Sequence, residues 1–257
     1  MPLMNPNLML CAALLLAPFS GFAADPVLKP EQGSKAETVT RSWSFVPDPK
    51  LPNVLILGDS ISIGYTLDVR SMLAGKANVY HPLSAEGNNA ENCSGTTKGV
   101  ESISRWLGNR KWDVIHFNFG LHDLKHVARA GEDTATSNAE DPRQASVEQY
   151  RQNLEPIVKT LRATGARLVF ATTTPVAPGT SNPLREPDAP PRYNAAAAAI
   201  MKKNGIRMND LFTFCTPQLA TWQLPKNVHF TAAGYKALAG EVARAIEQEL
   251  DAERSRK

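Results

Sequence analysis

The chain has 257 residues, of which 42% are hydrophobic and 21% are charged, and its formal net charge is +3. An apolar share of this size excludes a wholly disordered chain, and a charge so near neutral argues against an electrostatic nucleic-acid binder. Three cysteines are too few for a small module held together by disulfides. The remaining classes are a globular enzyme and a globular binding domain.

The first 24 residues contain no Asp, Glu, Lys or Arg, and a nearly continuous apolar run extends from Leu8 to Leu16. Small residues follow, ending at Ala24. This pattern predicts a secretory signal peptide over residues 1–24, with an uncleaved N-terminal anchor as the main alternative. We therefore expect export to the periplasm or the extracellular space, without stable membrane association once the signal has been cleaved.

The rest of the chain divides into three segments. Residues 25–50 carry Pro, Lys, Glu and Ser without apolar periodicity and are predicted to form a lead-in. Residues 51–252 are predicted to form one domain, and residues 253–257 a short tail.

Short apolar runs in this domain alternate with helical patterns. Apolar residues recur every three or four positions over 147–161 and over 235–250, where Thr231 is a candidate N-cap. Strands that alternate with helices predict a parallel sheet covered on both faces. The predicted strands are 54–57, 113–119, 167–171 and, more weakly, 206–208.

Two stretches, 129–146 and 175–192, match no regular element; the first is polar and the second contains six prolines. Loops of this length in a compact domain are commonly lids or binding loops. Arg192 and Tyr193 follow the second stretch, at the expected start of a helix over 195–199. They are candidates either to hold a sugar or carboxylate or to pack the helix start.

Ser60 follows the first predicted strand, at a strand-to-helix turn. Ligands of open α/β sheets gather at the carboxyl ends of the strands, so a serine at this position is a candidate nucleophile. The alternative is a helix N-cap. The turn is not the G-x-S-x-G elbow of α/β-hydrolases, because position 62 is also serine.

His229 is the candidate general base. Its imidazole has the intrinsic pKa to take a proton from serine and return it to a leaving group. It lies in a predicted loop between apolar elements, just before the last amphipathic helix.

Three sequence blocks stand in order along the chain: Gly58-Asp59-Ser60, Gly120-Leu121-His122-Asp123 and Val228-His229-Phe230-Thr231. They resemble those of the SGNH, or GDSL, hydrolase family, and the similarity extends over residues 53–250. The resemblance implies a flavodoxin-like three-layer α/β/α sandwich with a central parallel sheet. It also implies ester hydrolysis through an acyl-enzyme, with no metal or cofactor.

Carried over by this resemblance, Ser60 is the nucleophile and His229 the base. The oxyanion hole is formed by the N–H groups of Ser60 and Gly95 together with the side chain of His122, which stands where the family usually has Asn. An imidazole N–H can make the same hydrogen bond. Gly87 is the competing candidate for the glycine.

One position departs from the family pattern D-x-x-H, because Lys226 stands three residues before His229. An ammonium group cannot accept the Nδ1–H bond that orients the imidazole. Three alternatives remain: a backbone carbonyl of residues 224–227 could accept it, a carboxylate such as Asp210 or Glu241 could replace the missing acid, or the site could be weak or inactive. We expect an active Ser–His dyad.

Two further groups of side chains have residue types that bind metals or form disulfides. His122, Asp123 and His126 would share a face if helical, but no further His or Cys stands at a supporting spacing, so no metal site is predicted. Cys93 and Cys215 are the two cysteines outside the predicted signal peptide. Export permits a disulfide between them, and the sequence leaves their pairing open.

These features predict an exported serine esterase that removes small acyl groups, acetyl above all, from carbohydrate or other small-molecule esters. One alternative is a carbohydrate-binding protein of the same fold that has lost catalysis. Another is a lysophospholipase or thioesterase, which would need a larger apolar rim than the two long loops provide. The oligomeric state is left open.

Overall fold

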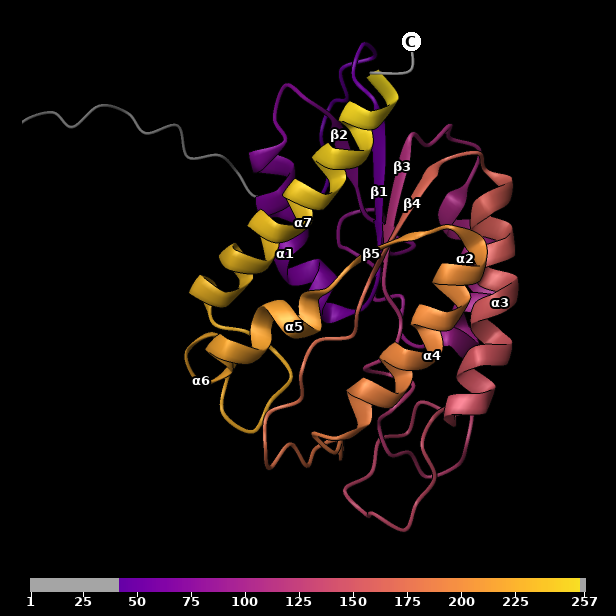
Figure 1. Ribbon diagram of the computed structural model, residues 1–257, viewed down its shortest axis with the longest axis vertical. Helices are drawn as coiled ribbons and strands as arrows, with labels where there is room; N and C mark the ends of the chain where they lie inside the picture. The colour runs from indigo at the N-terminus through magenta and orange to yellow at the C-terminus, as the bar shows by residue number, and fades with distance from the viewer. Residues whose placement is uncertain (1–41, 255–257) are drawn as a thin grey trace, which may run out of the picture. The chain divides into compact units, whose positions relative to one another are not determined.

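The computed structural model describes residues 42–254, which belong to one compact unit (Figure 1). The predicted signal peptide, the lead-in up to residue 41 and the end of the chain from residue 255 lie outside the described residues. Because the predicted domain 51–252 lies inside them, its fold can be compared with the prediction directly.

The centre of the fold is an all-parallel sheet of five strands in the order β2-β1-β3-β4-β5. This is the flavodoxin-like order, in which the ligand site lies at the switch point between β1 and β3. The predicted α/β sandwich is therefore confirmed. The strands are β1 (Asn53–Leu57), β2 (Asn78–Tyr80), β3 (Val114–Phe117), β4 (Arg167–Ala171) and β5 (Arg207–Asn209).

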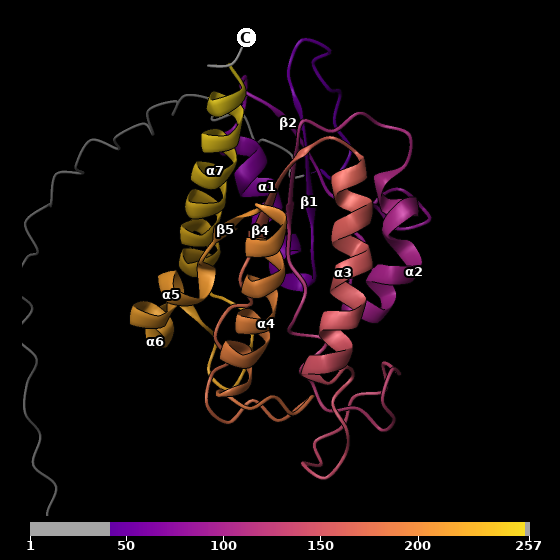
Figure 2. The same cartoon turned by 45° about the vertical axis from the view of Figure 1, so that its right-hand side comes forward.

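Helices cover both faces of the sheet. The first and last helices pack together on one face, and three others cover the opposite face (Figures 1 and 2). None of the described helices is long and apolar enough to cross a membrane. The helices are α1 (Ser60–Met72), α2 (Thr96–Leu107), α3 (Val147–Ala163), α4 (Ala189–Asn204), α5 (Leu211–Cys215), the 3₁₀ turn η1 (Thr216–Gln218), α6 (Leu219–Trp222) and α7 (Ala232–Arg254).

The core lies on both sides of the central strands. Residues 54–57 of β1 are at most 1% exposed, because a parallel sheet covered on both faces buries every side chain of its inner strands. Helices α1 and α7 approach closely at Gly64, where an added Cβ would overlap the ring of Tyr235. This contact fixes the position of the start of α7 relative to the start of α1.

Helix α4 begins earlier than predicted, at Ala189 instead of Ala195. Pro190 and Pro191 occupy its first turn, where the missing N–H groups break no helical hydrogen bond. Tyr193 therefore lies inside the helix. Its buried hydroxyl donates to the Ala145 carbonyl at 2.6 Å, which identifies the packing role for this side chain.

The two long loops lie together at the carboxyl ends of the strands (Figure 1). They are tied by backbone hydrogen bonds: Leu184 N–H donates to the Thr136 carbonyl, and His126 N–H donates to the Leu184 carbonyl, each at 2.9 Å. The loops 129–146 and 175–192 thus form one connected rim at the end of the sheet where ligands are expected.

Candidate active site

Ser60 is the first residue of α1. The residue before it, Asp59, is the N-cap: its carboxylate accepts the Ile61 N–H at 2.9 Å. The alternative role of Ser60 as the N-cap is therefore wrong. The backbone N–H of Ser60 has no hydrogen-bond acceptor among residues 42–254, as expected for the first turn of a helix.

The structure brings His229 to Ser60, with Ser60 Oγ 2.8 Å from His229 Nε2. The loop that carries His229 is held from both sides. Leu224 N–H donates to the His229 carbonyl at 2.9 Å, and Thr231 Oγ1 accepts the Gly234 N–H at 3.2 Å at the start of α7. Thr231 is thus the N-cap that the sequence predicted.

The orienting group of the histidine is the side chain of Asn227. Its Oδ1 lies 2.8 Å from His229 Nδ1 and 3.1 Å from the His229 backbone nitrogen. A backbone N–H can only donate, so the Asn227 atom facing it must be the amide oxygen. That oxygen then accepts from Nδ1–H, which leaves Nε2 unprotonated and able to accept from the Ser60 hydroxyl.

The acceptors considered from the sequence lie elsewhere. Asp210 caps α5 by accepting the Thr213 N–H at 3.1 Å, and Glu241 accepts from Asn209 Nδ2 at 2.9 Å. The interpretations of these carboxylates as replacements for the missing acid are therefore wrong. A backbone carbonyl is not used either, since the acceptor is a side-chain oxygen.

Lys226 is exposed and adopts a left-handed backbone conformation with φ of 53°. Its aliphatic stem lies along Gly179, where a Cβ would stand 3.3 Å from Lys226 Cγ. The cation that occupies the family's acid position is therefore directed along the surface of the second long loop.

His229 is held neutral. Burial lowers its pKa, and the positive charge of Arg185 lowers it further. A neutral imidazole with a free Nε2 lone pair is the form that removes a proton from a serine hydroxyl.

The loop before α2 lies beside the Ser60 turn. Cys93 N–H donates to the Gly58 carbonyl at 3.1 Å, and Ser94 Oγ lies 3.1 Å from His122 Nδ1. These contacts join the three loops that follow β1, β2 and β3. Gly95 comes next in this loop and is the N-cap of α2.

The two glycine candidates differ in what their N–H groups do. Gly87 N–H donates to the Ser84 carbonyl at 2.8 Å within its own turn. Gly95 N–H has no acceptor among the described residues, and Gly95 is buried. An added Cβ on Gly95 would stand 2.5 Å from Gln144 Oε1, so the loop approaches this closely only because a glycine is present. The geometry thus favours Gly95 over Gly87.

His122 carries its proton on Nε2. The ammonium of Lys125 lies 3.4 Å from His122 Nδ1, and because an ammonium can only donate, Nδ1 must be the acceptor. Burial, followed by the charge of Lys125, lowers the pKa of His122 to about 3. Lys125 is itself buried and pairs with Asp133 at 2.7 Å. His122 is therefore a neutral hydrogen-bond donor.

Asp123 and His126 have structural partners. Asp123 is buried, accepts the Thr96 N–H at 2.8 Å, and has a pKa raised to about 7 by burial. His126 lies between the Asp141 carbonyl and the Glu186 carboxylate. Within residues 42–254, no group of three His, Cys, Asp or Glu side chains could hold a metal ion.

Cys93 and Cys215 are both buried free thiols, so the disulfide that the sequence left open is not formed between them. Burial raises the pKa of each thiol to about 12. Neither thiol is therefore a nucleophile at neutral pH.

Comparison with known proteins identifies the family by a sequence model and the fold by similar solved structures. The sequence model of the GDSL-like Lipase/Acylhydrolase family matches residues 56–237. No curated protein sequence matches the chain.

Similar solved structures include the lipase/acylhydrolase from Enterococcus faecalis, with a TM-score of 0.60 and 18% identity over 77% of this chain and 96% of that one. The acetyl xylan esterase AlAXEase has a TM-score of 0.59 and 12% identity over 76% and 99%. A catalytic mutant of Axe2, an acetylxylan esterase from Geobacillus stearothermophilus, has a TM-score of 0.59 and 15% identity over 77% and 94%. At these identities the likeness shows the fold.

Proposed function

The chain belongs to the GDSL-like lipase/acylhydrolase family, and we propose that it is a serine esterase whose nucleophile is Ser60. One observation carries the proposal: Ser60 Oγ lies 2.8 Å from His229 Nε2, while His229 Nδ1–H is held by Asn227. This is the nucleophile–base–orienter arrangement of covalent catalysis.

In the first half-reaction, Ser60 Oγ attacks the ester carbonyl as His229 Nε2 takes the hydroxyl proton. The resulting oxyanion is stabilised by the N–H groups of Ser60 and Gly95 and by Nε2–H of His122. The imidazolium then protonates the departing alcohol. In the second half-reaction, water gives its proton to His229 and attacks the acyl-enzyme, and the acid and the Ser60 hydroxyl are released.

An amide can replace the family's carboxylate because it fixes the correct tautomer. Exchanging Asp for Asn in the triad of serine proteases costs about 10⁴ in kcat, because the wrong tautomer is stabilised. Here the His229 backbone N–H keeps the Asn227 oxygen facing the ring. Papain-like proteases show that a neutral amide serves as the orienter of a catalytic histidine.

We propose that the acyl group transferred from the ester to Ser60 is small, acetyl above all. A cavity of about 10 Å³ is lined by residues that include Ile61 and Leu121, the chain neighbours of Ser60 and His122. This is room for about one water-sized group. Two of the structures above are esterases of acetylated xylan, which gives a precedent on this fold for acetyl esters of carbohydrate.

The experiment compares acetate release from 4-nitrophenyl acetate and from acetylated xylo-oligosaccharides by the wild type, Ser60→Ala and Ser71→Ala. Ser71 is an exposed serine near the end of the same helix and serves as the matched control. We expect loss of activity in Ser60→Ala alone, and labelling of Ser60 by an alkyl phosphonate. Full activity in Ser60→Ala would overturn the proposed nucleophile.

Two further outcomes separate the alternatives. No turnover and no labelling between pH 5 and pH 9 would identify a binding protein that has lost catalysis. Faster hydrolysis of 4-nitrophenyl palmitate than of the acetate would identify a lysophospholipase or thioesterase. We also propose that residues 1–24 direct export, which N-terminal sequencing of the mature protein from cell fractions tests.

A further inference from the structure

Arg185, on the second long loop, is a buried cation at the candidate active site. It is 7% exposed. Its Nε–H donates to the Leu121 carbonyl at 2.8 Å, next to His122, and its backbone N–H donates to the Thr180 carbonyl at 3.2 Å. The guanidinium is therefore held in place by the loop that carries His122.

The charge of Arg185 is close enough to affect the proposed catalytic groups electrostatically. It acts on His122, on His229 and on Asp59, the cap of the helix that Ser60 begins. Burial lowers the pKa of Arg185 to about 10, which reflects the loss of hydration around its charge.

No described carboxylate neutralises this cation by contact. Asp59 exerts an electrostatic effect on it, but no carboxylate within residues 42–254 forms an ion pair with Arg185. The two terminal nitrogens have no hydrogen-bond partner in that part of the chain, and they are not sealed from solvent. Buried charges in proteins are generally paired. A buried arginine whose two terminal nitrogens have no partner at a candidate active site therefore indicates that an anion binds there from outside the chain.

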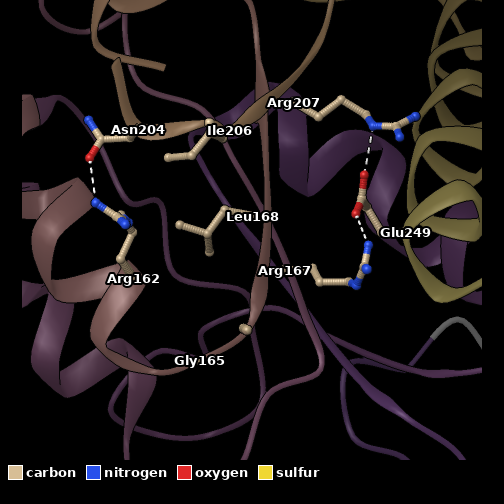
Figure 3. Close-up of a pocket in the computed structure, with 10 residues that line it drawn as sticks. Arg162, Gly165, Arg167, Leu168, Asn204, Ile206, Arg207 and Glu249 are labelled. Carbon is tan, nitrogen blue, oxygen red and sulfur yellow. Dashed lines mark hydrogen bonds and ion pairs between the residues drawn. The ribbon is translucent and has the colours of Figure 1, made fainter. Parts of the chain in front are cut away.

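The arginines at the opposite end of the sheet behave differently. A cavity of about 720 Å³ there is lined by several of them (Figure 3). Arg167 and Arg207 both contact Glu249, at 2.6 and 2.7 Å, and Arg162 donates to Asn204 at 2.9 Å. Glu249 neutralises Arg167 and Arg207, and Arg162 is exposed to water, so the named arginines of this cavity do not include a buried cation without an anion.

We propose that Arg185 binds a carboxylate carried by the substrate, so that the preferred esters are anionic. This inference rests on the proposed esterase function and specifies its substrate class. The planar guanidinium fork matches a carboxylate with two parallel hydrogen bonds, and the burial of Arg185 strengthens them. The carboxylate belongs either to the alcohol part, as in an acetylated uronic-acid saccharide, or to the acyl part, as in a hemisuccinate.

The test uses matched substrate pairs in which a carboxyl group is either free or methyl-esterified, and each rate is corrected for hydrolysis without enzyme. For the alcohol side, acetate release is measured from acetylated galacturonate oligomers and from the same oligomers with every carboxyl methyl-esterified. For the acyl side, 4-nitrophenyl hemisuccinate is compared with 4-nitrophenyl methyl succinate. The enzymes are the wild type, Arg185→Gln, Arg185→Lys and the control Arg162→Gln, which removes a cation from the far end of the sheet.

We expect the wild type to prefer the charged member of one pair by at least about tenfold in kcat/KM, since a charge-assisted hydrogen bond contributes this much. Arg185→Gln should abolish the preference, Arg185→Lys should retain part of it, and Arg162→Gln should keep it. The pair that shows the preference identifies the side of the ester that carries the carboxylate.

Equal rates on both pairs by an active wild type would overturn the inference, and this result does not depend on how any variant folds. A preference that survives in a folded Arg185→Gln would also overturn it. If the wild type hydrolyses none of the esters, the esterase proposal fails instead. Calorimetric binding of the acetylated galacturonate oligomer then decides: binding lost in Arg185→Gln supports the carboxylate site, and no binding to the wild type rejects it.

Discussion

Asn227 Oδ1 accepts two hydrogen bonds from one residue, His229: one from the ring nitrogen Nδ1 and one from the backbone nitrogen. The same oxygen therefore fixes the orientation of the main chain and the tautomer of the imidazole. The orienting group lies two residues before the histidine, whereas the family's acid stands three residues before it. Catalytic geometry is thus retained although the acid position holds Lys226.

The first prediction concerns this amide. Asn227→Ala should lower kcat by about 10- to 100-fold with little change in KM, since a hydrogen bond to the charged imidazolium contributes about 1.5–3 kcal/mol. Asn227→Asp should raise the pKa of His229 and move the acid limb of the kcat/KM profile to higher pH. Steady-state kinetics on 4-nitrophenyl acetate across pH 5–9 measures both effects.

Lys226→Asp is the matched control for Asn227. Its side chain is exposed, and Asp tolerates the left-handed backbone at this position. Activity should stay within about twofold of the wild type, as for an ordinary surface substitution. An Asn227→Ala enzyme as active as Lys226→Asp would show that the amide does not orient His229.

The second prediction concerns His122. His122→Ala should lower kcat by about 10²–10³, the usual cost of losing one oxyanion donor. His122→Asn should recover much of that loss, because the family's own residue type can donate at this position. Measuring kcat beside the melting temperature separates a lost donor from a damaged fold: equal activity in the Ala and Asn variants would contradict the donor role.

The third prediction distinguishes the two glycines. Gly95→Ala would press a Cβ against Gln144 Oε1 and displace the N–H proposed for the oxyanion hole, so kcat should fall at least about tenfold. Gly87→Ala meets no atom within 4 Å. It adds strain at a φ of 72° but should leave kcat unchanged. The reverse result in the same esterase assay would assign the donor to Gly87.

The fourth prediction concerns stability against pH. His116 is fully buried, lies 3.1 Å from Asn209 Oδ1, and has a pKa lowered to about 4 by burial. The unfolded chain takes up this proton near pH 6.5, but the folded chain does so only near pH 4. The contribution to stability is therefore present above pH 6.5 and is lost as the pH falls toward 4, at about 1.4 kcal/mol per pH unit.

Urea unfolding of the wild type and His116→Gln between pH 8 and pH 4 measures this contribution. Gln can donate to Asn209 but does not titrate, so the variant should lose less stability than the wild type below pH 6.5. The comparison between the two proteins removes the opposing effect of Asp123, whose raised pKa favours the folded state as the pH falls. Parallel curves for the two proteins would contradict the prediction.

The sheet was predictable where its strands are continuous apolar runs, as in residues 54–57, which are buried on both faces. β2 was missed because three residues at the edge of the sheet carry too little pattern. Helix α2 was missed because its first turn contains Thr96, Thr97 and Gly99, which have low helix propensity. Its N-terminus is fixed instead by Asp123, a tertiary contact that no local pattern reveals.

The same distinction applies to the site. The positions of Ser60 and His229 were predictable, because strand ends and family blocks place both at one edge of the sheet. Asn227 stands two residues before the histidine in the sequence, but its role depends on the backbone path of the loop. Lys125 and Arg185 reach the site through the backbone paths of the segments that follow β3 and β4, so neither has a sequence signal beyond its charge.

The nucleophile and its base lie 169 residues apart in the chain, and the packing of α7 on α1 at Gly64 brings them together. A chain that contains His229 but lacks α7 is therefore missing the helix whose packing on α1 brings this histidine to Ser60. If Ser60 and His229 act as proposed, ester cleavage requires that the last helix has docked on the first. The onset of hydrolysis of a chromogenic acetate can thus report when folding is complete, because it requires docking of the C-terminal helix.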